Sequence, residues 1–302
     1  MISHEDALQR AKLWNDTYDY IDTFFAERGY TQVRTPLAVQ CPGMEPNLDP
    51  VGVDLHVIRR GKVRAGLITS PEYSMKKLLG VGMERIYTVT PVFRSVEELG
   101  GDHSIEFTMI EWYRQHADYH ACMDETEALI DGFIGTSPQR SPQGEVGWPR
   151  YSYVDELAAW KGPTSDDTFN HYILPELMKR ADRFFVKEFP MSEAALAQKS
   201  PDGRSAERFE AYVGGMELCN GFTELVDADE QRARFLIELE ERRKAGKEAF
   251  PVDEELLRQL SSVASPTFGN ALGVDRLVML KAGTKDIDSI HLFPPSERFQ
   301  QL

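Results

Sequence analysis

Two carboxylates in the stretch "ERFEAYVGGMELCNGFTEL", residues 207–225, have the spacing that a divalent cation would require. If the glycines at 214–215 form a two-residue hairpin turn, Tyr212 pairs with Glu217 and shares its face with Glu210. The diagonal between the two glutamates is then roughly 7–8 Å at the backbone. Mg²⁺ prefers a few carboxylates together with phosphate oxygens and water. The alternative for this hairpin is that both glutamates are simply exposed to solvent.

A third carboxylate lies within the stretch "FRSVEELGGDHSIEFTMIEWYR", residues 93–114. Side chains alternate along a strand, so Glu111 shares one face with Phe107, Met109 and Tyr113. Burying an unpaired carboxylate among such neighbours would cost several kcal/mol or more. Either this face is an open site, or Glu111 meets a cation.

Two arginines have the surroundings of phosphate ligands. "GNALGVDR" places Arg276 in the first turn of a helix, where the dipole and the free amides favour anions. Arg276 could equally cap the helix or pair with Asp275 on the surface. Arg94 and His103 bracket the loop at 95–105 and would supply further phosphate contacts, although His103 could be an ordinary loop residue.

These residues must be positioned by helices and by antiparallel strands. The spacing of apolar residues predicts a helix over 5–28, and Ser70 with Pro71 begins another. Further segments have an expected structure: strands at 30–36, 64–70, 85–94 and 106–114, a surface connection at 136–150, a solvent-facing charged helix at 229–246, and a glycine-flanked turn before an apolar helix at 269–280. The absence of regular βαβ units favours an α+β fold.

The composition excludes several classes of protein. The 302 residues are 41% apolar, enough for a sizeable core, and no run is long enough to cross a membrane. With no leader at the N-terminus, we expect a cytoplasmic protein that binds no membrane. Cys41, Cys122 and Cys219 are too far apart for a disulfide framework or zinc site. The net charge of −15 argues against a surface built for nucleic acid.

Together, "FR…EFTMIEWYR", "ERFE…MELCNGFTEL" and "GNALGVDRL" resemble motifs 2 and 3 and the glutamate hairpin of class II lysyl-tRNA synthetases. "RGYTQVRTP" resembles their motif 1. The sequence is most similar to their stand-alone paralogues, which ligate β-lysine onto elongation factor P and share "SPEY.MK.LL", "EFTM.EWYR" and "AERFE". The similarity covers nearly the full chain, with the motifs in the same order.

The resemblance implies a class II catalytic core, an antiparallel sheet flanked by helices, as a single domain over residues 1–302 without an anticodon-binding domain. It also implies a homodimer formed through motif 1. The implied activity is ATP-dependent, AMP-forming activation of (R)-β-lysine or lysine as an adenylate. Elongation factor P would accept the product on a lysine side chain, and no stable tRNA binding is expected. An amino-acid activator for tRNA or another carrier is the alternative.

The resemblance also implies roles for individual residues. Arg94 and Arg276 would be catalytic, holding the α- and γ-phosphates, while Glu210 and Glu217 would hold Mg²⁺. The residues expected to bind ATP are Arg94, Glu97, Glu98, His103, Phe107 and Arg276. Phe107 would stack on adenine, and Glu97 or Glu98 would read its amino group. The residues expected to bind the amino acid are Ser70, Glu72, Glu111, Tyr113, Asn220, Glu224 and Ala271.

Some of these assignments have alternatives. Glu72 could merely complement the N-terminus of its helix, and Glu224 could cap the next helix. Ala271 could be a small helix-packing residue. The loop after Arg94 departs from the family pattern and is one residue longer, which leaves the choice between Glu97 and Glu98 open.

Overall fold

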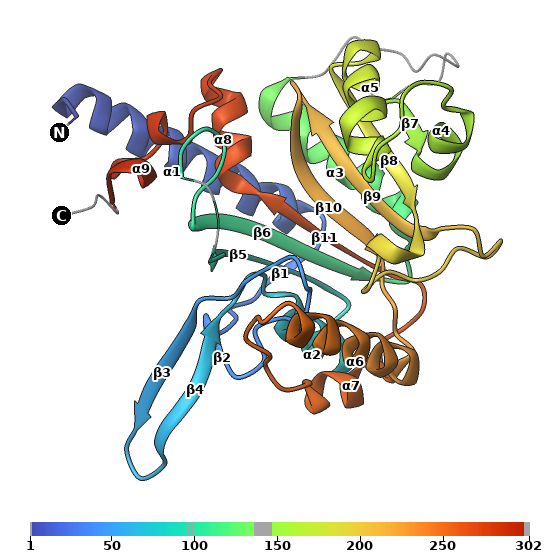
Figure 1. Cartoon of the computed structure of the whole chain (residues 1–302). Helices are drawn as coiled ribbons and strands as arrows, with labels where there is room; N and C mark the ends of the chain where they lie inside the picture. Colours follow the sequence, from blue (N-terminus) through green and yellow to red (C-terminus); the bar gives the residue numbers. More distant parts are fainter. Residues whose placement is uncertain (1, 96, 98, 136–146, 299–302) are drawn as a thin grey trace. The chain divides into compact units, whose positions relative to one another are not determined.

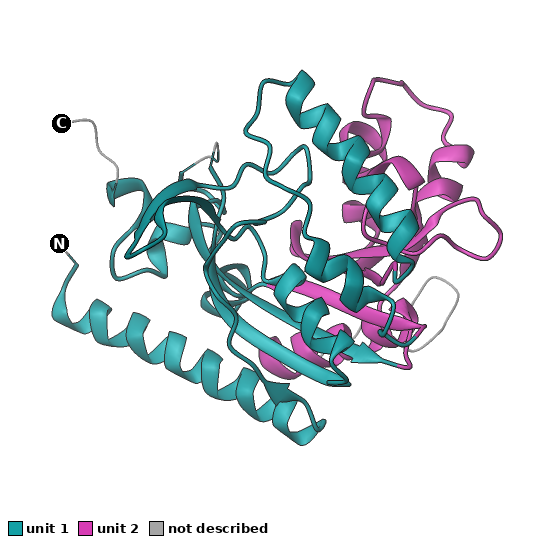
Figure 2. Ribbon diagram, turned by 90° about the horizontal axis from the view of Figure 1, so that it is seen from below, with its two compact units in different colours: residues 1–115, 226–264, 273–302 teal, residues 116–225, 265–272 magenta. Residues whose placement is uncertain are grey.

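The computed structural model describes residues 2–95, 97, 99–135 and 147–298, which form two compact units (Figure 2). Unit 1 comprises residues 1–115, 226–264 and 273–302, and unit 2 comprises residues 116–225 and 265–272. Both units combine strands with helices, so the expected α+β class is confirmed. Within the described part of the chain, no helix has the length and apolar character needed to span a membrane.

Unit 1 contains two groups of paired strands. In the first, β5 (Arg85–Phe93) pairs antiparallel with β6 (Glu106–Gln115) and parallel with the short β1 (Thr31–Gln32). In the second, β4 (Gly61–Leu67) lies between β2 (Ala38–Val39) and β3 (Gly52–Val57). The antiparallel pairing of β5 with β6 confirms the hairpin predicted at 85–114, and Thr88 lies opposite Glu111 in it.

The helices of unit 1 are α1 (His4–Glu27), α2 (Glu72–Gly80), α6 (Ala228–Lys244), α7 (Glu254–Leu260), α8 (Val274–Ala282), η3 (Ile287–Ser289) and α9 (Pro295–Arg298). The Ser3 side chain caps α1 by accepting the N–H of Asp6. Buried residues of α2 and β6, among them Met75, Leu79 and Tyr113, form one core cluster.

Unit 2 is built on strands β7 (Arg150–Ser152), β8 (Arg183–Phe189), β9 (Ala206–Val213), β10 (Met216–Thr223) and β11 (Thr267–Gly273), whose last residue belongs to unit 1. β8 to β11 pair antiparallel in sequence order (Figure 1). The helices are α3 (Tyr119–Ile134), α4 (Tyr153–Ala159), η1 (Phe169–Ile173), α5 (Leu174–Arg180) and η2 (Met191–Glu193). An aromatic cluster that includes Phe169, Phe184 and Tyr212 forms their core.

Three expectations need correction. The strands are not purely antiparallel, because β1–β5 and β7–β8 are parallel pairs. Residues 269–273 belong to strand β11 and not to a turn, because backbone pairing with β10 extends them. The helix at 228–244 directs most of its charges to solvent, as expected, although Glu238 and Arg242 are buried. Ser70 lies one residue before the N-cap Pro71. Residues 136–146 of the expected connection lie outside the described residues.

Candidate active site

In unit 1, the first turn of α2 and the middle of β6 meet at a buried carboxylate. Glu111 is 1% exposed, and both of its oxygens accept hydrogen bonds. Ser70 Oγ donates to Oε1 at 2.5 Å, and Tyr113 OH donates to Oε2 at 2.9 Å. Ser70 Oγ also accepts the N–H of Glu72 at 3.0 Å. The structure therefore brings together these four residues, all of which were predicted to bind the amino acid.

The charges around Glu111 are unbalanced. Burial, followed by the negative charge of Glu72, raises the pKa of Glu111 to about 8. Lys76 acts in the opposite direction, and its Nζ lies 2.5 Å from Glu72 Oε1 with only 2% of the lysine side chain exposed. The sequence interpretation missed Lys76, although the spacing of four residues from Glu72 on a helix was the available signal. Glu72 thus forms an ion pair as well as beginning its helix.

Further acidic residues influence the same region. Burial and the charge of Glu72 raise the pKa of Glu45. Burial and the charge of Glu45 raise the pKa of Glu238, on α6, to about 8. The hydroxyl of Tyr73 is buried and has no hydrogen-bond partner among the described residues, and its pKa is raised by burial and by Glu45. Glu45 and Glu238 were both missed, because they are far from Glu72 in the sequence.

Arg94 follows the end of β5, where its N–H donates to the carbonyl of Ile105 at 2.8 Å. Its guanidinium carbon lies 5.0 Å from the centre of the half-buried Phe107 ring, within reach of a cation–π contact. The structure therefore places Arg94 beside Phe107, and both residues were among those expected to bind ATP. Glu97 lies 3.1 Å from His103 through Oε1 and Nδ1. Glu98, the other candidate for reading adenine, lies outside the described residues.

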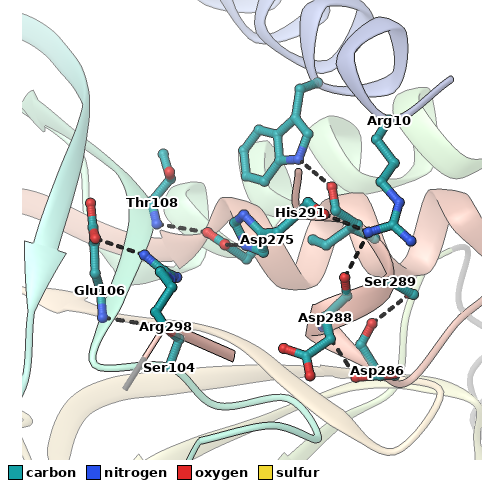
Figure 3. Close-up of polar contacts among 12 residues, drawn as sticks. Arg10, Ser104, Glu106, Thr108, Asp275, Asp286, Asp288, Ser289, His291 and Arg298 are labelled. Atoms are coloured by element: carbon teal, nitrogen blue, oxygen red, sulfur yellow. Dashed lines mark hydrogen bonds and ion pairs between the residues drawn. The ribbon is translucent and has the colours of Figure 1, made fainter. Parts of the chain in front are cut away.

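Arg276 occupies the first turn of α8, as predicted, but its neighbour does not pair with it on the surface. Asp275 is 2% exposed. One of its oxygens accepts the N–H of Thr108 at 2.6 Å, and the other lies 2.7 Å from His291 Nε2 (Figure 3). Asp275 therefore joins α8 to β6 next to Phe107. This role was missed, because only the fold places residue 108 beside residue 275.

In unit 2, the hairpin that carries the two glutamates has the predicted register at its turn. Tyr212 pairs with Glu217, as expected. Tyr212 OH donates to Glu210 Oε2 at 2.6 Å, and Arg208 Nη2 lies 2.5 Å from Oε1. Burial, followed by the charge of Glu217, raises the pKa of Glu210. Arg208 was missed, although it lies two residues before Glu210 and so on the same face of its strand.

The amino-acid residues predicted in unit 2 lie on neighbouring strands. An irregularity between Glu217 and Cys219 shifts the register, so that Asn220 lies opposite Glu210 on β9 and opposite Ala271 on β11. Cross-strand partners share a face, so these three residues form a row. Ala271 lies in strand β11 and not within a helix. Glu224 is buried, and its N–H donates to the carbonyl of Thr267 at 2.7 Å.

The donor set of the hairpin suits a cation that brings further oxygen ligands. Across the described ranges of the chain, no three His, Cys, Asp or Glu side chains are grouped to hold a metal ion. Glu210 and Glu217 are nevertheless close enough for the charge of one to raise the pKa of the other. A divalent cation would relieve this repulsion, and phosphate oxygens and water would complete its coordination. The two glutamates therefore fit Mg²⁺ bound together with a nucleotide.

Comparison with known proteins supplies independent information. The family model described as tRNA synthetases class II (D, K and N) matches residues 1–297. A protein of Erwinia tasmaniensis named "Elongation factor P--(R)-beta-lysine ligase" is 36% identical, over 90% of this chain and 91% of its own length. Proteins of the same name from Avibacterium paragallinarum and Haemophilus influenzae are each 34% identical, over 96% of this chain and 95% and 94% of their own lengths.

Proposed function

Because the chain belongs to the class II (D, K and N) tRNA synthetase family, we propose that it is an ATP-dependent ligase. It activates (R)-β-lysine, or lysine, as an adenylate and transfers it to a lysine side chain of elongation factor P. The names of its relatives support this acceptor. The observation that carries the proposal is Glu111, a buried carboxylate whose pKa is raised to about 8 and which lies among polar groups suited to an ammonium ion.

In the pocket, an ammonium group of the substrate pairs with Glu111 and draws it into its ionised form. The negative charge of Glu72 adds to the attraction, although Lys76 offsets part of it. Ser70 and Tyr113 fix the orientation of the carboxylate through their hydroxyl groups. The resemblance also assigns Asn220, Glu224 and Ala271 to the amino acid; they belong to unit 2, where Asn220 and Ala271 are cross-strand partners.

Activation forms a bond between a carboxylate oxygen of the amino acid and the α-phosphorus of ATP. The bond to the bridging oxygen breaks, and pyrophosphate leaves with the electron pair. Arg94 stabilises the charge that develops on the α-phosphate, and Arg276 binds the γ-phosphate. Phe107 stacks on adenine, with Glu97 or Glu98 reading its amino group and His103 giving a further contact. Glu210 and Glu217 would hold Mg²⁺, which would supply positive charge to offset that of the phosphates.

Transfer forms an amide with the acceptor. The neutral amine of the acceptor lysine attacks the carbonyl carbon of the adenylate, AMP leaves with the electron pair of the broken bond, and the amine releases a proton. We propose that one class II catalytic domain spanning residues 1–302 carries out both steps. The acceptor is a translation factor, which favours a cytoplasmic location. A homodimer through motif 1, around residues 28–36, completes the proposal.

The alternative acceptor is tRNA, which the family name also covers. A net charge of −15 disfavours a large phosphate-binding surface, so we expect no stable tRNA binding. Both acceptors can be offered in one experiment. The protein is incubated with ATP, labelled (R)-β-lysine or α-lysine, tRNA and elongation factor P.

We expect the label to enter elongation factor P as a stable amide. Label in tRNA that is released by mild base, formed at a catalytic rate, would favour the synthetase alternative. Failure of ATP–pyrophosphate exchange with every lysine isomer would contradict the proposed activation.

A further inference from the structure

The loop that joins β5 to β6 ends in a tight turn with a carboxylate at its tip. Gly100 and His103 exchange two backbone hydrogen bonds of 3.1 Å, which leaves Gly101 and Asp102 between them. Gly101 has a φ of 61°, a conformation that glycine adopts readily and most residues do not. The hydrogen-bonded turn therefore fixes the backbone position of Asp102.

The tip of this loop is also held by the C-terminal part of unit 1. The N–H of Ile287, at the start of η3, donates to the carbonyl of Gly101 at 2.7 Å. Arg10 on α1 in turn donates to the carbonyl of Asp288 at 2.9 Å, so η3 is tied to a long helix (Figure 3). The turn thus rests on a scaffold of regular elements from the same unit.

From this position, the carboxylate of Asp102 reaches Arg276. Asp102 Oδ2 lies 3.2 Å from Arg276 Nη2, and Oδ1 lies 3.3 Å from Nε2 of the neighbouring His103. A guanidinium binds carboxylates and phosphates through the same N–H donors, because both present negatively charged oxygens. Asp102 therefore forms an ion pair with Arg276, the residue to which the proposed function assigns the γ-phosphate.

We propose that Asp102 is an internal competitor of the nucleotide, and that it sets the affinity for ATP by occupying Arg276 until a phosphate displaces it. The proposal rests on the proposed function, which assigns Arg276 to a phosphate. The side chains of Asp102 and Arg276 are 34% and 23% exposed, so water screens their attraction. The free energies typical of such pairs correspond to a change of about two- to fivefold in affinity.

The test is the variant Asp102→Asn, which keeps the size of the side chain and removes its charge. We expect the KM for ATP in pyrophosphate exchange to fall by about two- to fivefold, with kcat unaltered. The Kd for ATP in calorimetry should fall by the same factor. A higher KM would overturn the proposal, because it would mean that Asp102 helps ATP to bind. An unaltered KM would also overturn it, because it would mean that Asp102 does not compete with ATP.

Removing any negative charge from an acidic protein favours an anionic ligand, so a matched control is needed. Glu254→Gln removes one carboxylate from another arginine pair of unit 1, in which Arg232 Nη2 lies 2.5 Å from Glu254 Oε2. We expect this variant to leave the KM for ATP unaltered. An equal fall in both variants would show an effect of net charge alone and would overturn the role of Asp102.

A double variant tests whether Asp102 acts through Arg276. In an Arg276→Ala background, Asp102→Asn should no longer tighten ATP binding in calorimetry, because the guanidinium for which they compete is gone. Persistence of the full effect would overturn the proposal. Failure of the proposed function gives a different result: the wild type would bind ATP yet exchange no pyrophosphate with any lysine isomer, while the binding effect of Asp102→Asn would still be measurable.

Discussion

Ser70 donates a 2.5 Å hydrogen bond to Glu111 and so joins the segment that leads into α2 to the middle of β6. Together with Tyr113, it satisfies both oxygens of a carboxylate that is 1% exposed. These hydrogen bonds favour the ionised form, but burial outweighs them and raises the pKa of Glu111 to about 8. A cation placed beside Glu111 would therefore lower its pKa and stabilise its ionised form.

Replacing Glu111 by Gln should selectively weaken binding of the amino acid. Gln keeps the shape of the side chain and can still bond to Ser70 and Tyr113, but it cannot form an ion pair. Losing one partner of a buried charge pair costs about 2–5 kcal/mol, so the KM for either lysine isomer should rise at least about 30-fold. The measurement is pyrophosphate exchange against amino-acid concentration. Glu255→Gln, on the exposed side of α7, is the control, and equal effects in the two variants would contradict the assignment.

The same variant should alter how stability depends on pH. The folded protein keeps the Glu111 proton up to about pH 8, whereas the unfolded chain releases it near pH 4.5. The folded state therefore binds more protons in this window, and the contribution of Glu111 to the free energy of unfolding falls as pH rises through it. Glu111→Gln lacks this loss, so its stability relative to the wild type should grow from pH 5.5 to 8.5 in denaturant titrations. Parallel pH profiles would contradict the raised pKa.

The phosphate and metal groups should be needed for activation and not for folding. Arg94→Ala and Glu217→Ala each remove a charge that the transition state requires, and such losses typically lower the rate about 10²–10³-fold. Pyrophosphate exchange measures the rate, and circular dichroism checks the fold. Exchange at the wild-type rate in both variants would show that neither residue serves ATP.

Ala271 should govern the choice between lysine isomers. It lies opposite Asn220, so its methyl group shares the face of the predicted amino-acid residues. An α-amino group would crowd this methyl, and a β-amino group lies one carbon further away. We expect the wild type to prefer (R)-β-lysine, and Ala271→Gly to raise exchange with α-lysine at least about tenfold, since one methyl discriminates by about 10–200-fold. If Ala271→Gly changed exchange with both isomers equally, the preference for β-lysine would lose this support, and only activation of an unspecified lysine isomer would remain proposed.

Arg242 should be essential for the stability of unit 1. It is 1% exposed, and its guanidinium donates to the carbonyls of Glu45, Leu48 and Glu248 and lies 3.2 Å from Asp49 Oδ1. Arg242→Met fills a similar volume but leaves these acceptors without their donor and Asp49 without this charge partner. We expect a loss of about 3–5 kcal/mol in the free energy of unfolding, measured by denaturant titration. Arg243→Met, one position along the same helix, is the control and should lose far less stability. A loss below about 1 kcal/mol in Arg242→Met would contradict the argument.

The sequence by itself determined the class of fold and named most of the residues that are candidates for the site. Periodicity placed α1 and the β5–β6 hairpin, because alternation and helical spacing are local properties. The pair of glycines at 214–215 set the register of Tyr212 with Glu217, because a two-residue turn leaves the strands no other pairing there. The sequence also indicated that Glu111 lies on an apolar strand face, because the alternation of side chains along a strand is a local property.

Only the tertiary structure decided how the charges of these residues are balanced. Lys76 beside Glu72, Asp275 beside Thr108 and Asp102 beside Arg276 depend on which elements pack together. The same holds for β11, which was expected as a turn and became a strand through its pairing with β10. The physical reason is that burial and ion pairing join groups distant in the sequence, and a pKa follows from the desolvation and charges that the completed fold creates.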